Sequence, residues 1–149
     1  MASIEQEINS KIVDDKQKFV VNLVYTSGLI KNMFTDFIKP YDISSQQFNI
    51  LRILRGDGDW LSMNIVKERM IEKSPNATRL ADKLISKKLI ERQRSDADRR
   101  VVFVKITKLG LELLTKIDTK DNVKFEELIS KISPEEAKLV SDILDKMRG

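Results

Sequence analysis

Apolar residues recur at helical spacing through the N-terminal part of the chain. Between residues 8 and 38 they return at steps close to one or two helical turns until Pro40 interrupts the pattern, which predicts a first helix of roughly thirty residues. Ser44 with Gln47 has the pattern of a capping box and should begin a second helix that ends at the turn 56–59. This half of the chain is therefore expected to be helical.

A short third helix is expected over 63–70, and a basic fourth helix should follow it. Ser74 is a favoured N-cap residue, and Pro75 is favoured at the first helical position. This helix should run to about Lys88. At 100° per residue its side chains form two stripes: an apolar one of Ala77, Leu80, Ala81 and Leu84, and a polar one of Asn76, Arg79 and Lys83. One face is predicted to pack and the other to remain free for recognition.

Two short segments after this helix are typical of β-strands. Residues 90–94 and 101–106 are rich in β-branched and aromatic side chains and should pair as a hairpin. The loop between them lacks the Asn-Gly or Gly-rich sequence of tight turns. It carries two aspartates followed by the adjacent Arg99 and Arg100. Charge at a hairpin tip indicates a binding partner.

The C-terminal third again has helical periodicity. Thr107 should cap a long helix whose apolar face continues to Ile129, and Ser133 followed by Pro134 and Glu136 should begin the last helix. Broad apolar faces at both ends of the chain need a surface that covers them. A second copy of the chain is the simplest cover, because symmetric dimers are the commonest oligomers. Packing back onto the chain's own domain is the alternative.

Composition narrows the class of protein. At 149 residues, 41% of them hydrophobic, the chain has the size and apolar content of one domain, and no apolar run is long enough to span a bilayer. Residues 1–7 lack the basic and apolar regions of a secretory signal, so a cytoplasmic location is expected. Residues 62–106 hold 12 Lys and Arg against 6 Asp and Glu, a net +6, while the rest holds 15 against 17, a net −2. A local positive field of this kind is typical of a phosphate-binding surface.

The sequence carries no catalytic motif. Without His or Cys, the usual zinc sites, cysteine nucleophiles and His-based triads cannot form. The turn 56–59 has two aspartates but lacks the alternating ligands and the glutamate of an EF-hand, and no glycine-rich phosphate loop is present. The chain is therefore expected not to be an enzyme and to use no cofactor or metal.

Five segments together give a family resemblance. They are 43–51 (ISSQQFNIL), 76–84 (NATRLADKL), 89–92 (LIER), 98–100 (DRR) and 106–110 (ITKLG). In this order and spacing the chain resembles MarR-type winged-helix transcription regulators. The resemblance implies a mainly α fold with a small β-hairpin wing. Within a single chain of 1–149 it places a winged helix-turn-helix lobe at 44–106 and dimerisation helices at 8–38 and 108–149.

The same resemblance implies a function. Members act as homodimers on palindromic operators in double-stranded DNA, and a small-molecule effector often releases them, so a repressor is expected. The alternative is a winged-helix module that binds an acidic protein surface, or a sensor dimer without DNA binding. A basic helix with Ala77 instead of an acidic residue at N3, and arginines at the wing tip, favour DNA.

The candidate DNA-binding residues lie on the fourth helix and the wing: Ser74, Asn76, Thr78, Arg79, Lys83, Arg99 and Arg100. Arginine suits guanine and asparagine suits adenine in the major groove. The resemblance implies that Asp82 pairs with Arg100 and that a wing arginine enters the minor groove. We assign Arg99 to the groove, with Asp82 and Asp98 holding Arg100; the reverse roles for the two arginines remain open.

Other basic and aromatic residues receive weaker assignments. A group of six is expected to contact phosphates or remain solvated: Lys67, Arg69, Lys87, Lys88, Arg92 and Arg94. The family's effector pockets lie where dimer helices meet the DNA-binding lobes, and the aromatic residues near that place are Phe34, Phe37, Tyr41 and Trp60. Since apolar residues are more often core than ligand contacts, none is assigned to a site.

Overall fold

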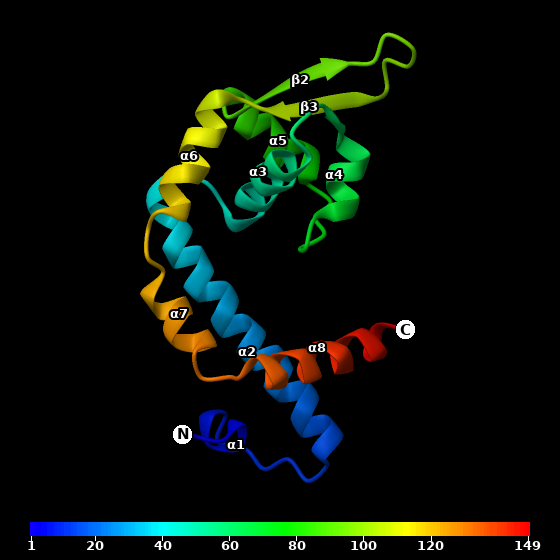
Figure 1. The fold of residues 1–149 in the computed structure, drawn as a ribbon. Helices are drawn as coiled ribbons and strands as arrows, with labels where there is room; N and C mark the ends of the chain where they lie inside the picture. The colour runs from blue at the N-terminus through cyan, green and yellow to red at the C-terminus, as the bar shows by residue number, and fades with distance from the viewer. The chain divides into compact units, whose positions relative to one another are not determined.

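The computed structural model describes residues 1–149 and is mainly helical with one small sheet (Figure 1). It confirms the expected combination of helices and a hairpin. The elements are α1 (Ile4–Glu7), α2 (Asp15–Ile38), the 3-10 helix η1 (Lys39–Tyr41), α3 (Ser45–Asp57), β1 (Leu61–Ser62), α4 (Met63–Arg69), α5 (Ala77–Ser86), β2 (Ile90–Arg94), β3 (Val102–Ile106), α6 (Lys108–Asp118), α7 (Val123–Ile129) and α8 (Pro134–Arg148). None of these helices combines the length and the apolar character needed to cross a membrane.

The chain forms two compact units. The first contains residues 1–34 and 122–149, and the second contains residues 35–121. The expected boundaries of the DNA-binding lobe, 44–106, lie inside the second unit. We call these units the helical unit and the winged unit.

The helical unit begins differently from the expectation. The prediction of one continuous helix from Ile8 is wrong. Helix α2 starts at Asp15, and the separate helix α1 precedes it. Ser3 caps α1 in a capping box with Gln6, and Asn9 then adopts a left-handed conformation with φ 50°. Asp14 accepts a hydrogen bond from the Gln17 amide at 2.8 Å and so caps α2. These local caps override the apolar spacing that continues through residues 8–12.

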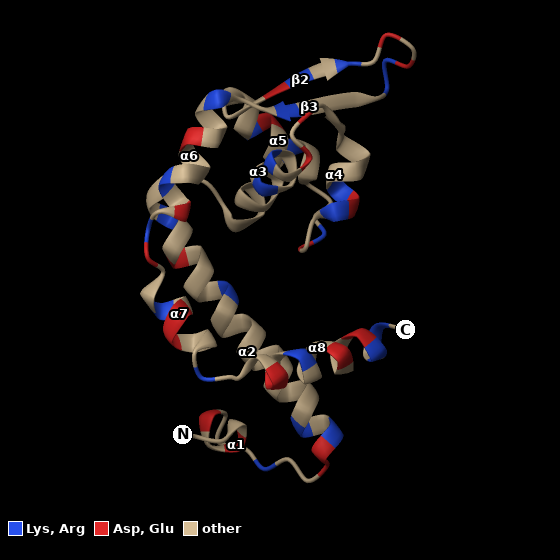
Figure 2. Ribbon diagram, in the orientation of Figure 1, with Lys and Arg blue, Asp and Glu red and all other residues tan.

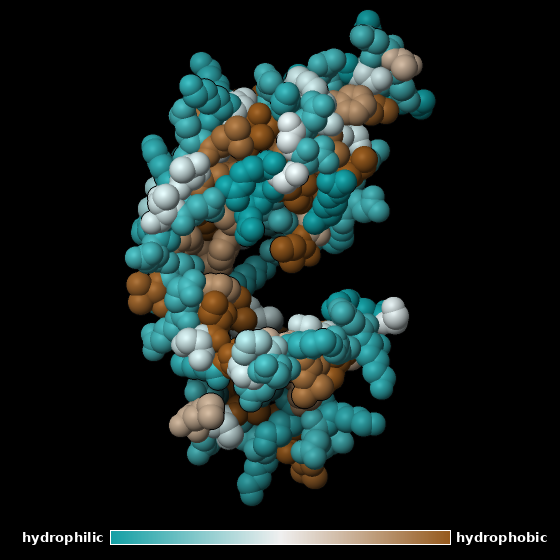
Figure 3. Space-filling view, in the orientation of Figure 1, coloured by the Kyte–Doolittle hydropathy of each residue, from teal (hydrophilic) through white to brown (hydrophobic).

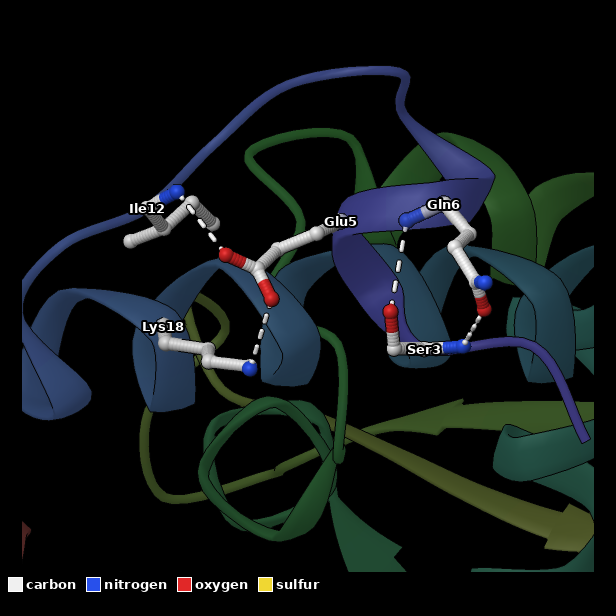
Figure 4. A network of polar contacts seen from close by, with 5 residues as sticks. All are labelled: Ser3, Glu5, Gln6, Ile12 and Lys18. Atoms are coloured by element: carbon white, nitrogen blue, oxygen red, sulfur yellow. Dashed lines mark hydrogen bonds and ion pairs between the residues drawn. The ribbon is translucent and has the colours of Figure 1, made fainter.

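A polar network holds the N-terminal segment against α2 (Figure 4). Glu5 lies at its centre: one carboxylate oxygen accepts from the Ile12 amide at 3.1 Å, and the other is 2.8 Å from Lys18 Nζ. The hydrogen bond from Lys18 lowers the pKa of the Glu5 carboxyl, and the same contact raises the pKa of Lys18. Glu7 accepts from the Tyr25 hydroxyl at 3.2 Å, and its negative charge raises the pKa of that hydroxyl.

The C-terminal helices also differ from the expectation in one place. The prediction of one long helix from Thr107 is wrong, because α6 ends at Asp118 and α7 begins at Val123. Asn122 caps α7 by accepting a hydrogen bond from the Phe125 amide at 3.3 Å. The last helix is confirmed: Ser133 and Glu136 form a capping box before α8. Apolar residues remain at the surface along the helices of the helical unit (Figure 3).

The winged unit has its core between α3, α5 and a three-stranded antiparallel sheet of order β1-β3-β2. Its fully buried side chains include Ile50, Leu51, Leu54, Leu84 and Val104. The hairpin is confirmed, with Ile90 opposite Ile106 and Arg94 opposite Val102. Strand β1 was not expected; it places Leu61 opposite Val104 and makes β3 the central strand.

Caps define the starts of α3 and α4, and the cap of α3 is the expected one. Ser44 and Gln47 form the predicted capping box, and α3 ends where Gly58, at φ 79°, donates its amide to the Leu54 carbonyl. Ser62 accepts from the Ile65 amide at the start of α4. The turn 56–59 therefore terminates a helix, as its glycines favour.

Thr107 joins the end of α5, the sheet and α6. Its hydroxyl donates to the Lys88 carbonyl at 2.7 Å and accepts from the Gly110 amide at 3.1 Å. Helix α6 then packs so closely that a Cβ on Gly110 would lie 2.7 Å from Ile106 Cγ1 and closer still to the Leu89 carbonyl oxygen. Only glycine fits at this approach.

Candidate DNA-binding surface

Helix α5 has one buried face and one exposed face. Ala77, Ala81 and Leu84 of the predicted apolar stripe are buried, and Leu80 is half-buried. Among the polar candidates, four are exposed: Asn76, Thr78, Arg79 and Lys83. The structure thus confirms the division into two faces.

The start of α5 lies two residues later than expected. Ser74 is not its N-cap: the helix begins at Ala77, with Asn76 at the N-cap position and no side-chain hydrogen bond from it. Ser74 Oγ instead accepts from the Asn76 amide at 3.2 Å, in a local turn through Pro75. A serine bonded to the amide two residues on forms a turn that competes with helical capping. No acidic residue lies in the first turn of α5, so its positive end faces no carboxylate of its own.

Buried Gln47 fixes α5 against α3. The Gln47 side chain is only 5% exposed, and its Oε1 accepts from the Ser44 amide at 2.9 Å. Its Nε2 donates to the Leu80 carbonyl of α5 at 3.3 Å. One side chain therefore completes the cap of α3 and sets the position of α5. Sequence reasoning identified Gln47 as a cap but missed this second contact.

The wing tip is an ordered turn. Ser95 donates its amide to the Val101 carbonyl at 3.0 Å and accepts from the Asp98 amide at 3.3 Å. Asp98 Oδ1 accepts both the backbone amide of Arg100 at 3.0 Å and its Nε at 3.2 Å. Arg99 and Arg100 are both exposed. Ser95, which the sequence did not single out, closes the loop that presents the two arginines.

The expected pairing of Asp82 with Arg100 is wrong for this structure. Asp82 Oδ1 lies 3.3 Å from an Arg92 guanidinium nitrogen, and Arg100 pairs with Asp98 alone. The reason is geometric: Arg92 lies in the middle of β2, which packs beside α5, whereas Arg100 lies in the loop that precedes β3, where Asp98 accepts from its Nε. The sequence alone predicts for Arg92 only a phosphate contact or a solvated charge.

A groove of about 230 Å³ lies between α4, α5 and the hairpin. Side chains of α4, α5 and the hairpin line it, including Lys67, Thr78, Asp82, Arg92 and Arg100. The rest of the lining includes apolar side chains, among them Met63, Ala81 and Ile85. The basic and hydroxyl side chains of the groove can contact phosphates.

The remaining basic candidates divide into paired and unpaired residues. Lys87 lies 3.0 Å from an Asp42 carboxylate oxygen, and Arg69 lies 3.1 Å from Asp57. Lys67, Lys88 and Arg94 are exposed. Figure 2 shows blue basic segments along α4, α5 and both strands of the hairpin, with acidic residues interspersed.

The other sites considered from the sequence have structural roles. In the turn 56–59, Asp57 pairs with Arg69, and Asp59 accepts from the Trp60 amide and lies 3.7 Å from Lys105 Nζ. No group of three or more His, Cys, Asp or Glu side chains is arranged to hold a metal ion. Of the aromatic residues, Phe37 and Tyr41 face Lys120, whose ammonium lies 5.9 and 5.7 Å from their ring centres.

Comparisons with known proteins agree with this geometry. The chain is similar to the HTH-type transcriptional regulator MhqR of Bacillus subtilis, at 29% identity over 128 residues covering 86% of each chain. Its fold matches AbsC, a MarR family transcriptional regulator of Streptomyces coelicolor, with a TM-score of 0.80 at 18% identity, covering 93% and 95% of the two chains. It also matches a mutant MarR of E. coli complexed with operator DNA, with a TM-score of 0.74 at 22% identity, covering 92% and 99%.

A family model shows to which protein family the chain belongs. Residues 32–117, more than half of the sequence, match the family of the transcriptional regulator SarA/Rot. This match covers α3 to β3 and most of α6, and so includes the whole surface described above. The family and its relatives are transcriptional regulators and not enzymes. The chain belongs to the SarA/Rot family of transcriptional regulators and has the winged-helix fold of MarR-type proteins.

Proposed function

We propose that this regulator binds a palindromic operator as a homodimer and acts as a repressor. The observation that carries the proposal is the exposed polar face of α5 beside a wing tipped with two exposed arginines. The groove beside them contributes Lys67, Thr78 and Arg92 as further side chains that can donate to phosphates. Blocking of a promoter by a bound dimer is the simplest consequence of such binding.

The roles of individual residues follow from their positions. Asn76, Thr78, Arg79 and Lys83 on α5 contact the major groove, and the Ser74 hydroxyl with the open end of α5 binds a phosphate. Arg99 enters the minor groove at the wing. Asp98 holds Arg100 beside it, as its two hydrogen bonds to Arg100 support.

The homodimer is proposed to form through the terminal helices, residues 8–38 and 108–149. In the helical unit, large apolar side chains are exposed on three helices: Val20, Val24, Leu29 and Ile30 on α2, Val123 and Ile129 on α7, and Leu139, Val140, Ile143 and Met147 on α8. A second copy presents the same apolar surface and can cover it by twofold symmetry.

Regulation is proposed to come from a small molecule and not from thiol oxidation. The chain has no cysteine, so peroxide sensing through a thiolate cannot operate. A ligand that binds one dimer geometry better than the other shifts the population toward that geometry. Because both recognition helices must match the groove spacing, a small change of dimer geometry is enough to release the operator.

Selection from random duplexes tests the proposal. The purified protein should return a palindrome with half-sites about one helical turn apart. With on the order of ten phosphate contacts per dimer, log K should fall about nine times as fast as log salt rises. Recovery of no palindrome, with an affinity that salt does not change, would favour the alternative of a protein-interaction module.

A further inference from the structure

Asp82 is the one acidic residue on the recognition helix α5. Its side chain is 54% exposed and lines the groove between α5 and the wing. A free carboxylate at this place would repel the phosphates of a bound duplex. A DNA-binding surface that contains Asp82 therefore needs a cation beside it.

Arg92 is the cation that lies beside Asp82, at 3.3 Å. It comes from the middle of β2, opposite Val104, and lines the same groove. Arg100 has a different environment. Its side chain is 92% exposed, and its Nε is bonded to Asp98 within the wing turn.

We propose that Arg92 is a positioning residue of the DNA-binding surface. It neutralises Asp82 and ties α5 to strand β2, which fixes the wing relative to the recognition helix without drawing on Arg100, whose partner is Asp98. This inference rests on the proposed DNA-binding function and adds to it a residue that acts through Asp82. An exposed ion pair contributes little to folding, so its effect should appear in DNA binding more than in thermal stability.

Arg94 provides a matched control on the same strand. Residues two apart on a strand share a face, so Arg94 has the same charge and orientation as Arg92. It is exposed and has no acidic partner in the structure. Arg94→Ala therefore removes an equal charge without exposing Asp82.

The experiment measures the affinity for the selected operator over a series of salt concentrations. Arg92→Ala should weaken binding about tenfold, because each dimer loses two copies of the pair, with the salt slope of the wild type retained. Arg99→Ala should lower the slope by about two, because Arg99 is exposed without an acidic partner and two phosphate-neutralising charges per dimer are lost. Arg94→Ala should weaken binding less than Arg92→Ala, and Arg92→Lys should recover most of the affinity. Thermal unfolding should confirm that every variant is folded.

A double-mutant cycle assigns the partner of Asp82. In an Asp82→Ala background, Arg92→Ala should change affinity by less than about twofold, whereas Arg100→Ala and Arg94→Ala should keep their full effects. Coupling of Asp82 to Arg100 in place of Arg92 would overturn the inference, as would an Arg92→Ala slope that falls like that of Arg99→Ala. Failure of the wild type to bind any duplex would instead overturn the proposed function, and this inference with it.

Discussion

The two units of the molecule bury their apolar residues in opposite ways. The winged unit contains 19 of the 20 buried hydrophobic residues, and only Ile4 belongs to the helical unit. The helical unit contains 13 of the 17 exposed large hydrophobic residues. The winged unit therefore has a core of its own, while the helices of the other unit present apolar faces that their own chain does not cover.

Because of this difference, the two units are stabilised in different ways. Burial of apolar surface is the main favourable contribution to folding, so the winged unit is stabilised within one chain. The helical unit gains most of that contribution only when another surface covers it. The proposed DNA recognition and the proposed dimer formation thus belong to parts of the chain with different physical requirements.

The largest effect is expected from a charge placed on the exposed apolar face of α8. Leu139→Glu combined with Ile143→Glu should convert the dimer to a monomer, because two carboxylates per chain would have to be buried without partners. A monomer binds one half-site, so operator affinity should fall about 10²–10⁴-fold. Analytical ultracentrifugation and operator titration measure the two changes.

Ser141→Glu is the control for this change. Ser141 is exposed on the opposite side of α8, where its hydroxyl donates to the Ala137 carbonyl. It adds a negative charge to the same helix without touching the apolar face, and the dimer should persist. A dimer that survives the double substitution would show that the exposed face of α8 is not the interface.

A second prediction concerns the close packing of the winged unit. Gly110→Ala should lower the free energy of unfolding by roughly 1–3 kcal/mol, since its methyl group would overlap Ile106 and the Leu89 carbonyl. Gly56→Ala, in a helix with open space around it, should be neutral or stabilise by about 0.5–1 kcal/mol. Urea unfolding of both variants measures the contrast. Equal effects would mean that α6 moves to accept the added methyl.

A third prediction separates base recognition from phosphate binding within the winged unit. Arg79→Ala should cost roughly 1–3 kcal/mol on the preferred operator and relax the preference at one base position. Lys88→Ala should weaken binding to all sequences about equally. Titration against a panel of single-base operator variants tests both, and a uniform loss for Arg79→Ala would remove it from base recognition.

Local patterns predicted the elements whose ends are set by neighbouring residues. The capping boxes at Ser44 and Ser133 lie where expected, because each needs only a side chain and a backbone amide three residues away. The hairpin formed as its β-prone segments indicated. The exposed face of α5 followed from periodicity alone.

Periodicity misled where apolar spacing continues through a break. It gave no sign of the interruption before Asn122, or of the left-handed Asn9 between α1 and α2. In both places a polar residue next to the break, Asn122 or Asp14, caps the following helix, and this signal was present in the sequence. The Asp82–Arg92 pair had no such local signal, because it depends on which residue of β2 packs beside α5.

The smallest expected effect concerns the one ordered polar network of the N-terminal segment. The pKa of Glu5 lies below its ordinary value of 4.5, chiefly because Lys18 donates to the carboxylate and also because the Ile12 amide does. A lowered folded pKa means that the ionised carboxylate stabilises the folded segment above pH 4.5, and that this contribution is lost as the pH falls through the folded value. The segment should therefore loosen in acid while the winged unit, whose core is apolar, remains folded.

Hydrogen exchange of the Ile12 amide against pH measures this: protection should fall below about pH 4.5 in the wild type, after correction for the intrinsic exchange rate. Glu5→Gln should show weaker protection that does not change over the same range. A wild-type protection factor independent of pH from 6 to about 3 would contradict the role given to this carboxylate.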